Sequence, residues 1–351
     1  MSRVLILRLG TLVSLPISLR FLLVAPALLI FLAISAYAAL NIGATATSLQ
    51  DALSALFLPL DSLERPARAI AQFRMPRLGV AILAGAMMAA SGYLLQVVSR
   101  NGLADPGILG LSDGAALTVM AAGFFFGLMP GGALSLLALG GALLTALVVL
   151  GLGRHLLAGG GIILIGLSIN IVLGSLIEMI LVSGSAMNFA QLMNWSRGTL
   201  AAVDATDLGL LGLWFALLFP LALLTSRLLQ PMLLGDEPAQ ALGVRARLVY
   251  VFYVLLAAAF AAPVVAVCGP VAFVGLMSCY IARRLIGDRP TEVLITGMLA
   301  GGLILLWADT IGRSLFQPVI ISAGVMVSVV GVLSFILAAS LGRLQSPNWR
   351  D

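Results

Sequence analysis

The chain has 351 residues, of which 61% are hydrophobic and only 9% are charged, and its mean hydropathy is +1.15. Too few polar residues remain to cover a soluble globule of this length, so the composition predicts an integral membrane protein. All 19 basic residues are arginines. Without lysine the chain can build neither a P-loop nor a Schiff base, so any ATP hydrolysis must come from a partner.

Ten apolar segments approach the length of about 20 residues that a helix needs to cross a bilayer. The sixth, eighth and ninth are short, and we expect tilt, kinking or partial insertion there. We therefore predict an all-α polytopic membrane protein with about ten transmembrane helices, forming one transmembrane domain over residues 1–351. The predicted spans are 21–40, 78–98, 108–126, 133–152, 161–182, 208–224, 248–267, 271–286, 293–308 and 319–341.

The N-terminus and the arginines predict the orientation. Arg3, Arg8 and Arg20 precede an apolar run as in a signal peptide, but the run is longer than a signal-peptide core and nine more follow, so we expect a retained first helix. With both termini inside, 13 arginines lie inside and six outside, which agrees with the positive-inside rule. The net charge of +5 then reflects topology and not nucleic-acid binding.

Three arginines stand against that trend at the predicted outer face. Arg74 and Arg77 open the second span, and Arg313 closes the ninth. Interfacial arginines usually anchor a helix or snorkel to the interface. In the outer loop before them, residues 49–60 carry apolar side chains at helical spacing, which predicts a short surface helix that is either a solvated connector or a docking element.

A polar, glycine-rich hairpin at residues 100–117 separates the second and third spans. Proline and glycine cannot sit in a lipid-facing helix without freeing backbone groups, so this backbone must be shielded by protein or line a watery path. The residues of this motif that we single out are Asn101, Asp105, Pro106, Gly107 and Gly110.

Two further motifs lie beyond the sixth span. In residues 234–243 we expect Asp236 to cap a short helix and Gly243 to end it. Gly269, Pro270 and Gly275 mark the start of the eighth span and predict a proline-kinked, closely packed helix start. The nearby Cys268 and Cys279 are expected in the apolar core, with a disulfide as the weaker alternative.

Acidic side chains within spans are few. Asp113 and Asp309 lie near span ends, and Asp309 is expected to pair with Arg313 one helical turn away. Glu178 lies deeper in the fifth span. Because a buried acid in a membrane is costly, Glu178 should face the bundle or an aqueous path.

These motifs together resemble one family. The run from Arg100 to Ala115 is similar to R-N-P-L-A-D-P-G-x-L-G-x-S-x-G-A, with Gly102 in place of the proline; residues 234–243 match L-G-x-x-x-A-x-x-L-G, and residues 269–276 match G-P-I-x-F-V-G-L with valine for isoleucine. Such segments are typical of the FecCD-type permease subunits of iron(III)-siderophore and cobalamin ABC importers. The chain departs from that pattern at Cys279-Tyr280, where the family has P-H, and within 320–335, where an acid and two prolines are missing.

The resemblance implies a fold and partners. Helices two to five and seven to ten would form an inverted repeat. The permease would work in the bacterial inner membrane with two cytoplasmic ATPase subunits, a periplasmic binding protein and a second permease, a heterodimer being favoured over a homodimer by the departures. No resident metal or cofactor is implied. The expected cargo is a ferric siderophore, with heme and cobalamin next.

The resemblance also implies residue roles. Arg74, Arg77 and Arg313 would receive acidic residues of the binding protein, and the fifth helix would line the path, with Glu178, Asn170 and Ser175 as candidates. For Glu178 a structural polar contact is an equal alternative. The alternative function is an ion-coupled secondary transporter that uses Glu178, Asp113 or Asp309. The ATPase coupling element, residues 233–245, would act through Gly235, Asp236, Glu237, Ala239, Leu242 and Gly243.

Overall fold

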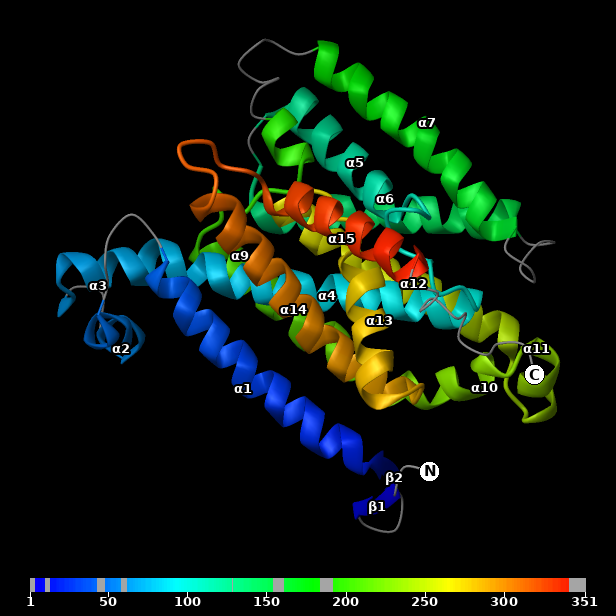
Figure 1. Cartoon of the computed structure of the whole chain (residues 1–351). Helices are drawn as coiled ribbons and strands as arrows, with labels where there is room; N and C mark the ends of the chain where they lie inside the picture. The colour runs from blue at the N-terminus through cyan, green and yellow to red at the C-terminus, as the bar shows by residue number, and fades with distance from the viewer. Residues whose placement is uncertain are drawn as a thin grey trace.

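The computed structural model describes residues 4–9, 13–42, 48–57, 62–127, 129–153, 161–183 and 192–340. Each of the ten predicted spans contains a helix, which confirms the all-α polytopic fold. Figure 1 shows a bundle of long helices, with α2 and α3 at one end and α10 and α11 at the other. The α-helices are α1 (Leu19–Asn41), α2 (Leu49–Phe57), α3 (Arg65–Ala69), α4 (Met75–Ser99), α5 (Leu111–Phe126), α6 (Gly131–Leu152), α7 (Gly161–Ser183), α9 (Ala205–Thr225), α10 (Leu229–Leu233), α11 (Asp236–Ala241), α12 (Ala246–Cys268), α13 (Val274–Ile286), α14 (Pro290–Ser314) and α15 (Ala323–Ser340).

Seven helical segments in the described part of the chain are long and apolar enough to cross a membrane, and α5 and α15 contribute shorter apolar helices. The expectation that the sixth and ninth spans are short was wrong, because α9 and α14 extend over 21 and 25 residues. The helices extend beyond the apolar runs into polar residues. At the start of α9, Asp204 and Asp207 form a capping box. The expectation holds for α13, which has 13 residues.

A short β-hairpin precedes the first helix, which the sequence analysis did not anticipate. Strands β1 (Val4–Leu9) and β2 (Val13–Ser18) pair antiparallel, with Val4 opposite Ser18. The hairpin leads directly into α1, because Ser18 both ends β2 and caps the helix through its side chain, which accepts a hydrogen bond from Phe21 N.

Helix α4 forms the centre of the bundle, with α9, α12, α13 and α14 packed around it. Glycines allow this close packing. A Cβ atom on Gly85 would lie 2.2 Å from the carbonyl oxygen of Gly301 in α14, and one on Gly92 would lie 2.7 Å from Cα of Gly275 in α13. Small residues at these crossings therefore bring the backbones together, as they do in other membrane bundles. Cys268 and Cys279 are both buried and free, in agreement with their predicted place in the core.

Helix α1 runs along α14 at the edge of the bundle and is held at both ends by side chains from other helices. At its start, Ser18 donates from its backbone N and its Oγ to the two carboxylate oxygens of Glu292, at 2.7 and 2.5 Å. At its end, Arg74 donates to the carbonyl oxygen of Leu40 at 2.6 Å, and Arg313 donates to that of Ala39 at 2.8 Å. The helix has no acid in its first turn and no base in its last. Its neighbours therefore supply the charges that favour each end of the helix dipole.

Candidate functional site

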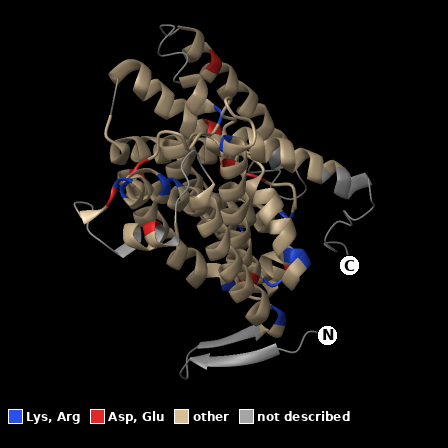
Figure 2. Cartoon of the chain, turned by 60° about the vertical axis from the view of Figure 1, so that its left-hand side comes forward, with Lys and Arg blue, Asp and Glu red and all other residues tan. Residues whose placement is uncertain are grey.

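Three regions carry the polar groups predicted to be functional. They are the end of the bundle that holds α11, the glycine-rich hairpin of residues 100–117 with the cavity beside it, and the opposite end that holds the three arginines. We call the first end inner and the last end outer, following the predicted orientation. At the inner end, Ser226 Oγ lies 2.8 Å from Thr291 Oγ1, so the end of α9 and the start of α14 meet there. Figure 2 shows charged positions at the base of α1.

The coupling element forms a short helix, but the predicted cap was wrong. Helix α11 begins at Asp236, directly after Gly235, and no side chain caps it. Gly235 has a φ of +111°, a conformation that glycine adopts without strain, so the chain turns sharply there and the helix starts one residue earlier than a cap at Asp236 would allow. The Asp236 carboxylate instead accepts a hydrogen bond from Arg100 Nη2 at 3.0 Å.

The other end of α11 follows the prediction. Gly243 has a φ of +81°, and Val244 N donates to the carbonyl oxygen of Ala239 at 2.9 Å, so the helix ends in a left-handed turn. Ala239 is fully buried, whereas Leu242 is 64% exposed and Glu237 is exposed. The element is thus fixed to the bundle by one side and presents an apolar and an acidic side chain on the other.

The glycine-rich hairpin is packed inside protein, one of the two environments predicted for it. Ala104, Asp105 and Pro106 are buried. Asn101 Oδ1 accepts a hydrogen bond from Leu103 N at 2.8 Å, and Asp105 Oδ1 accepts one from Gly107 N at 2.9 Å. These side chains replace the backbone partners that a helix would have supplied.

Gly110 completes the turn into the next helix. It precedes α5 with a φ of +74°. The carbonyl oxygen of Pro106 accepts hydrogen bonds from Leu111 N at 2.9 Å and from Ser112 N at 3.3 Å. The hairpin backbone therefore leads into α5 through its own hydrogen bonds.

The hairpin also contacts two other helices. Asn170 of α7 donates to the carbonyl oxygen of Gly107 at 2.5 Å. Gly275 of α13 lies beside the Asp105 carboxylate, because a Cβ on this glycine would be in van der Waals contact with Asp105 Oδ2 at 3.4 Å. Because Arg100 at the base of the hairpin binds Asp236, a continuous set of contacts joins α11 to α7 and α13.

A cavity of about 510 Å³ lies beside the hairpin, between α5, α7, α15 and the segment before α13. Asp105 and Ser112 line it, and their side-chain atoms Asp105 Oδ2 and Ser112 Oγ are buried with no hydrogen-bond partner among the described residues. Of the three pathway candidates, Asn170 lines the cavity. Ser175 and Glu178 do not line it and lie on the exposed side of α7.

The motif at Gly269 and Pro270 forms one wall of this cavity through a tight backbone contact. Gly269 has a φ of +77°, and a Cβ there would lie 2.0 Å from the carbonyl oxygen of Trp195. Gly324, next to the start of α15, donates from its N to the carbonyl oxygen of Gly198 at 2.9 Å. The segment around Trp195 is therefore held between the end of α12 and the start of α15.

The outer arginines bind groups of this same chain. Arg77 donates from Nε and Nη2 to the two carboxylate oxygens of Asp309, at 2.8 and 2.7 Å. The predicted pair of Asp309 and Arg313 is present at 3.8 Å, and Asp309 is only 3% exposed. Since Arg74 and Arg313 also bind the end of α1, all three side chains have a structural role; Arg77 and Arg313 keep 22% and 16% of their side-chain surface exposed.

Two contacts at the inner end of the bundle were not predicted from the sequence. The pairs Ser18–Glu292 and Arg100–Asp236 join residues 274 and 136 positions apart, which no local pattern reveals. The one available signal for the first was that the segment at 19–41 has no acid of its own near its start.

Comparison with known proteins decides the family. A model described as the FecCD transport family matches residues 28–340. The chain belongs to the FecCD transport family. It is similar to the Fe(3+)-citrate import system permease protein YfmE of Bacillus subtilis (strain 168), with 37% identity over 268 residues covering 76% of this chain and 80% of that protein. It is also similar to the vitamin B12 import system permease protein BtuC of Yersinia enterocolitica serotype O:8, with 34% identity over 271 residues covering 76% and 79% of the two chains.

A solved structure agrees with this membership. The chain resembles a metal-chelate type ABC transporter in an inward-facing conformation, with a TM-score of 0.79 and 25% identity, covering 91% of this chain and 99% of the other. The FecCD chain described here is therefore a membrane permease of the importer class. The comparisons support that function and give no support to the ion-coupled secondary transporter.

Proposed function

We propose that this permease carries a ferric chelate of the siderophore class across the bacterial inner membrane, driven by ATP. It would receive the cargo from a periplasmic binding protein and work with two cytoplasmic ATPase subunits and a second permease. The family match over residues 28–340 carries the proposal. The named relatives carry ferric citrate and vitamin B12, which are both large metal chelates, so heme or cobalamin are the next candidates.

The proposed coupling begins at α11. Its exposed side presents Leu242 and Glu237 to the cytoplasm, where an ATPase groove would bind them, while buried Ala239 transmits the motion to the bundle. Arg100 would carry the motion into the hairpin, and the contact of Gly107 with Asn170 would pass it to α7 at the cavity. This chain of contacts supports a mechanical link between the ATPase and the path.

The second permease would complete that path. The cavity beside the hairpin is bordered by α7 and α15, whose outward sides carry exposed apolar residues such as Ile171, Met179, Val330 and Leu333. A second subunit placed against these helices would enclose the cavity and bring the exposed Glu178 to the boundary. The acid and two prolines that the family has within 320–335 are missing from this chain, which favours a heterodimer. The second permease would then carry the typical segment.

The outer arginines are the proposed binding-protein dock. Arg77 and Arg313 already pair with Asp309, but the three guanidinium groups outnumber this one carboxylate and leave a net positive outer patch. Such a patch would steer an acidic partner and mainly set its rate of association. The anchoring role seen in the structure is compatible with this second role, because Arg77 and Arg313 remain partly exposed.

A co-purification experiment tests the coupling part of the proposal. The permease is expressed with its candidate ATPase, and the amount of ATPase retained on the membrane is measured for wild type and for Glu237→Arg. We expect Glu237→Arg to lower retention or to leave ATP hydrolysis uncoupled from uptake, whereas Arg247→Ala, on an exposed residue of the neighbouring helix, serves as the control. Full uptake by the Glu237→Arg variant would contradict the assignment of α11.

A further inference from the structure

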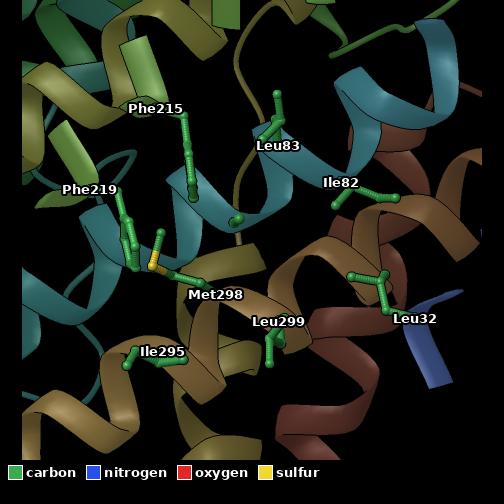
Figure 3. Close-up of a pocket in the computed structure, with 9 residues that line it drawn as sticks. Leu32, Ile82, Leu83, Phe215, Phe219, Ile295, Met298 and Leu299 are labelled. Atoms are coloured by element: carbon green, nitrogen blue, oxygen red, sulfur yellow. The ribbon is translucent and has the colours of Figure 1, made fainter. Parts of the chain in front are cut away.

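A second hollow, far from the cavity beside the hairpin, lies on the lipid-facing side of the bundle between α1 and α9. Figure 3 shows Leu32 of α1 on one side, Phe215 and Phe219 of α9 on the other, and Met298 and Leu299 of α14 between them. Its volume is about 160 Å³, and every residue that lines it is apolar. We call it the α1–α9 groove.

The groove exists because its two walls rest on different parts of the core. Helix α1 packs on α14, and α9 packs on α4 and α12. Ala86 of α4 is a small residue on the groove lining. The rings of Phe215 and Phe219 stack with their centroids 5.2 Å apart and an angle of 9° between the planes, and both rings line the groove. The groove is apolar throughout.

The groove lies at a depth that an acyl chain of the inner leaflet reaches. Phe219 is eight residues before Arg227, which places its Cα about 12 Å from that of Arg227 along the helix axis at 1.5 Å per residue. One leaflet of the hydrocarbon core is roughly 15 Å thick, half of the whole. Methylene groups of a lipid whose headgroup sits at the inner surface therefore pass this level.

Two exposed arginines flank the inner ends of the same helices. Arg20 is the second residue of α1, and Arg227 follows Ser226 at the end of α9. Both are exposed, and neither has a partner among the described residues. The inner ends of α1, α9 and α14 meet there, since Ser18 binds Glu292 and Ser226 contacts Thr291. Glu292 is only 4% exposed and already bound, so it leaves the two guanidinium groups open to an external anion.

We propose that the α1–α9 groove binds one acyl chain of an anionic phospholipid from the inner leaflet, with the lipid phosphate held by Arg20 and Arg227. The size of the groove decides the kind of occupant. Apolar cavities of about 150 Å³ hold a molecule of the size of benzene, so the groove takes a few methylene groups. A helix of a second copy, about 10 Å across with its side chains, does not enter a slot of this size.

The consequence is that a lipid holds α1 against α9. The exposed α1 is fixed to the bundle through its ends and through α14, and the lipid chain would fill the remaining gap. Each arginine near a membrane surface raises the affinity of the protein for an anionic lipid roughly fivefold. Two arginines should therefore give a clear preference for anionic over neutral headgroups. This role does not depend on which cargo the permease carries.

Native mass spectrometry of the full-length permease tests the proposal. The purified protein is equilibrated with mixed micelles that contain equal amounts of dioleoyl phosphatidylglycerol and dioleoyl phosphatidylcholine, and retained lipids are counted. We expect wild type to retain phosphatidylglycerol preferentially, and Arg20→Ala/Arg227→Ala to lower the ratio of the two lipids at least fivefold. The matched control Arg245→Ala/Arg247→Ala removes two exposed arginines at the start of α12 and should leave the ratio unchanged.

A second pair of variants tests the groove itself. Ala86→Leu should fill it and reduce retention of both lipids, whereas Ala216→Leu, on an exposed position of α9, should not. Ile295→Phe fills the groove from α14 and keeps the test valid if Ala86→Leu fails to fold.

Three results would overturn the proposal. The first is equal retention of the two lipids by wild type, and the second is an equal effect of the two arginine pairs. The third is unchanged lipid retention when the groove is filled. Loss of dimers by Ala86→Leu with no loss of lipid would instead assign the groove to a second copy.

Discussion

The two ends of the bundle use arginine–aspartate pairs in opposite ways. At the outer end, Arg77 and Arg313 converge on Asp309, which is 3% exposed, and Arg74 and Arg313 close the end of α1. At the inner end, Arg100 and Asp236 are 29% and 39% exposed and join the start of the glycine-rich hairpin to α11. The comparison teaches that charge pairs of the same kind differ in burial, which separates the outer anchor from the inner pair that we propose as a movable link.

The largest expected effect comes from breaking the buried outer pair. Asp309→Asn leaves the Arg77 and Arg313 guanidinium groups without their anion, and removal of one partner of a buried ion pair costs about 3–5 kcal/mol. We expect a corresponding loss in the free energy of unfolding, measured by denaturation in detergent. The control Asp288→Asn removes a carboxylate that is 67% exposed and should change stability by less than about 0.5 kcal/mol. Equal stability of the two variants would show that the outer pair is not an anchor.

A smaller effect is expected at the inner end of α1. Glu292→Ala removes the acceptor of the Ser18 N–H and Oγ groups, both of which are buried. Leaving such groups unpaired costs about 2 kcal/mol, and the favourable charge at the start of the helix is lost as well. Glu64→Ala, at an exposed position whose side chain makes no cap hydrogen bond, should be close to neutral in the same assay. A neutral Glu292→Ala would mean that packing on α14 and the arginine contacts at the outer end hold α1 without this bond.

The inner pair should matter little for stability and much for coupling. Exposed ion pairs contribute about 0.2–1 kcal/mol, so Arg100→Asp should unfold at nearly the wild-type temperature. If the pair transmits motion from α11, uptake per ATP hydrolysed should fall in Arg100→Asp and recover in part in Arg100→Asp/Asp236→Arg. If uptake falls and does not recover in the double variant, the defect lies in the backbone of the glycine-rich hairpin and not in the ion pair.

The smallest effect is expected at the proposed dock. Arg74→Gln removes one charge of the outer patch but keeps a donor for the Leu40 carbonyl oxygen. We expect the association rate of the binding protein to fall about two- to fivefold at low salt and to approach the wild-type rate at high salt. Arg65→Gln, an exposed outer residue on α3, is the control. Identical rates for all three proteins would limit the arginines to anchoring.

The sequence predicted features that depend on local patterns, and it did not predict contacts between distant residues. The apolar runs located a helix at each of the ten spans, because burial in lipid requires continuous apolar length. The exact ends of α9 and α14 were missed, since capping residues such as Asp204 extend a helix beyond its apolar part. The pair of Asp309 and Arg313 was predictable because the residues lie one turn apart. The shorter contact of Asp309 with Arg77 was not, because it joins residues 232 positions apart.

The same limit applies to the candidate site. The motifs at residues 100–117 and 234–243 were visible in the sequence, but the ion pair that joins them depends on how α4 and α11 come together. The role expected for Asp236 as a cap failed because Gly235 takes a backbone conformation that starts the helix early. The pathway candidates were chosen because they lie on the fifth span, and the sequence did not show which side of that helix faces the cavity. Only Asn170 lies on that side.

Transport by the reconstituted system tests the central claim most directly. The permease is placed in liposomes with its candidate second permease and ATPase subunits, and uptake of a radioactive ferric siderophore is measured with the binding protein, with and without ATP. We predict uptake only when ATP, the ATPase and the binding protein are all present. Uptake by the permease chain alone, without ATP or any ATPase, would contradict the account.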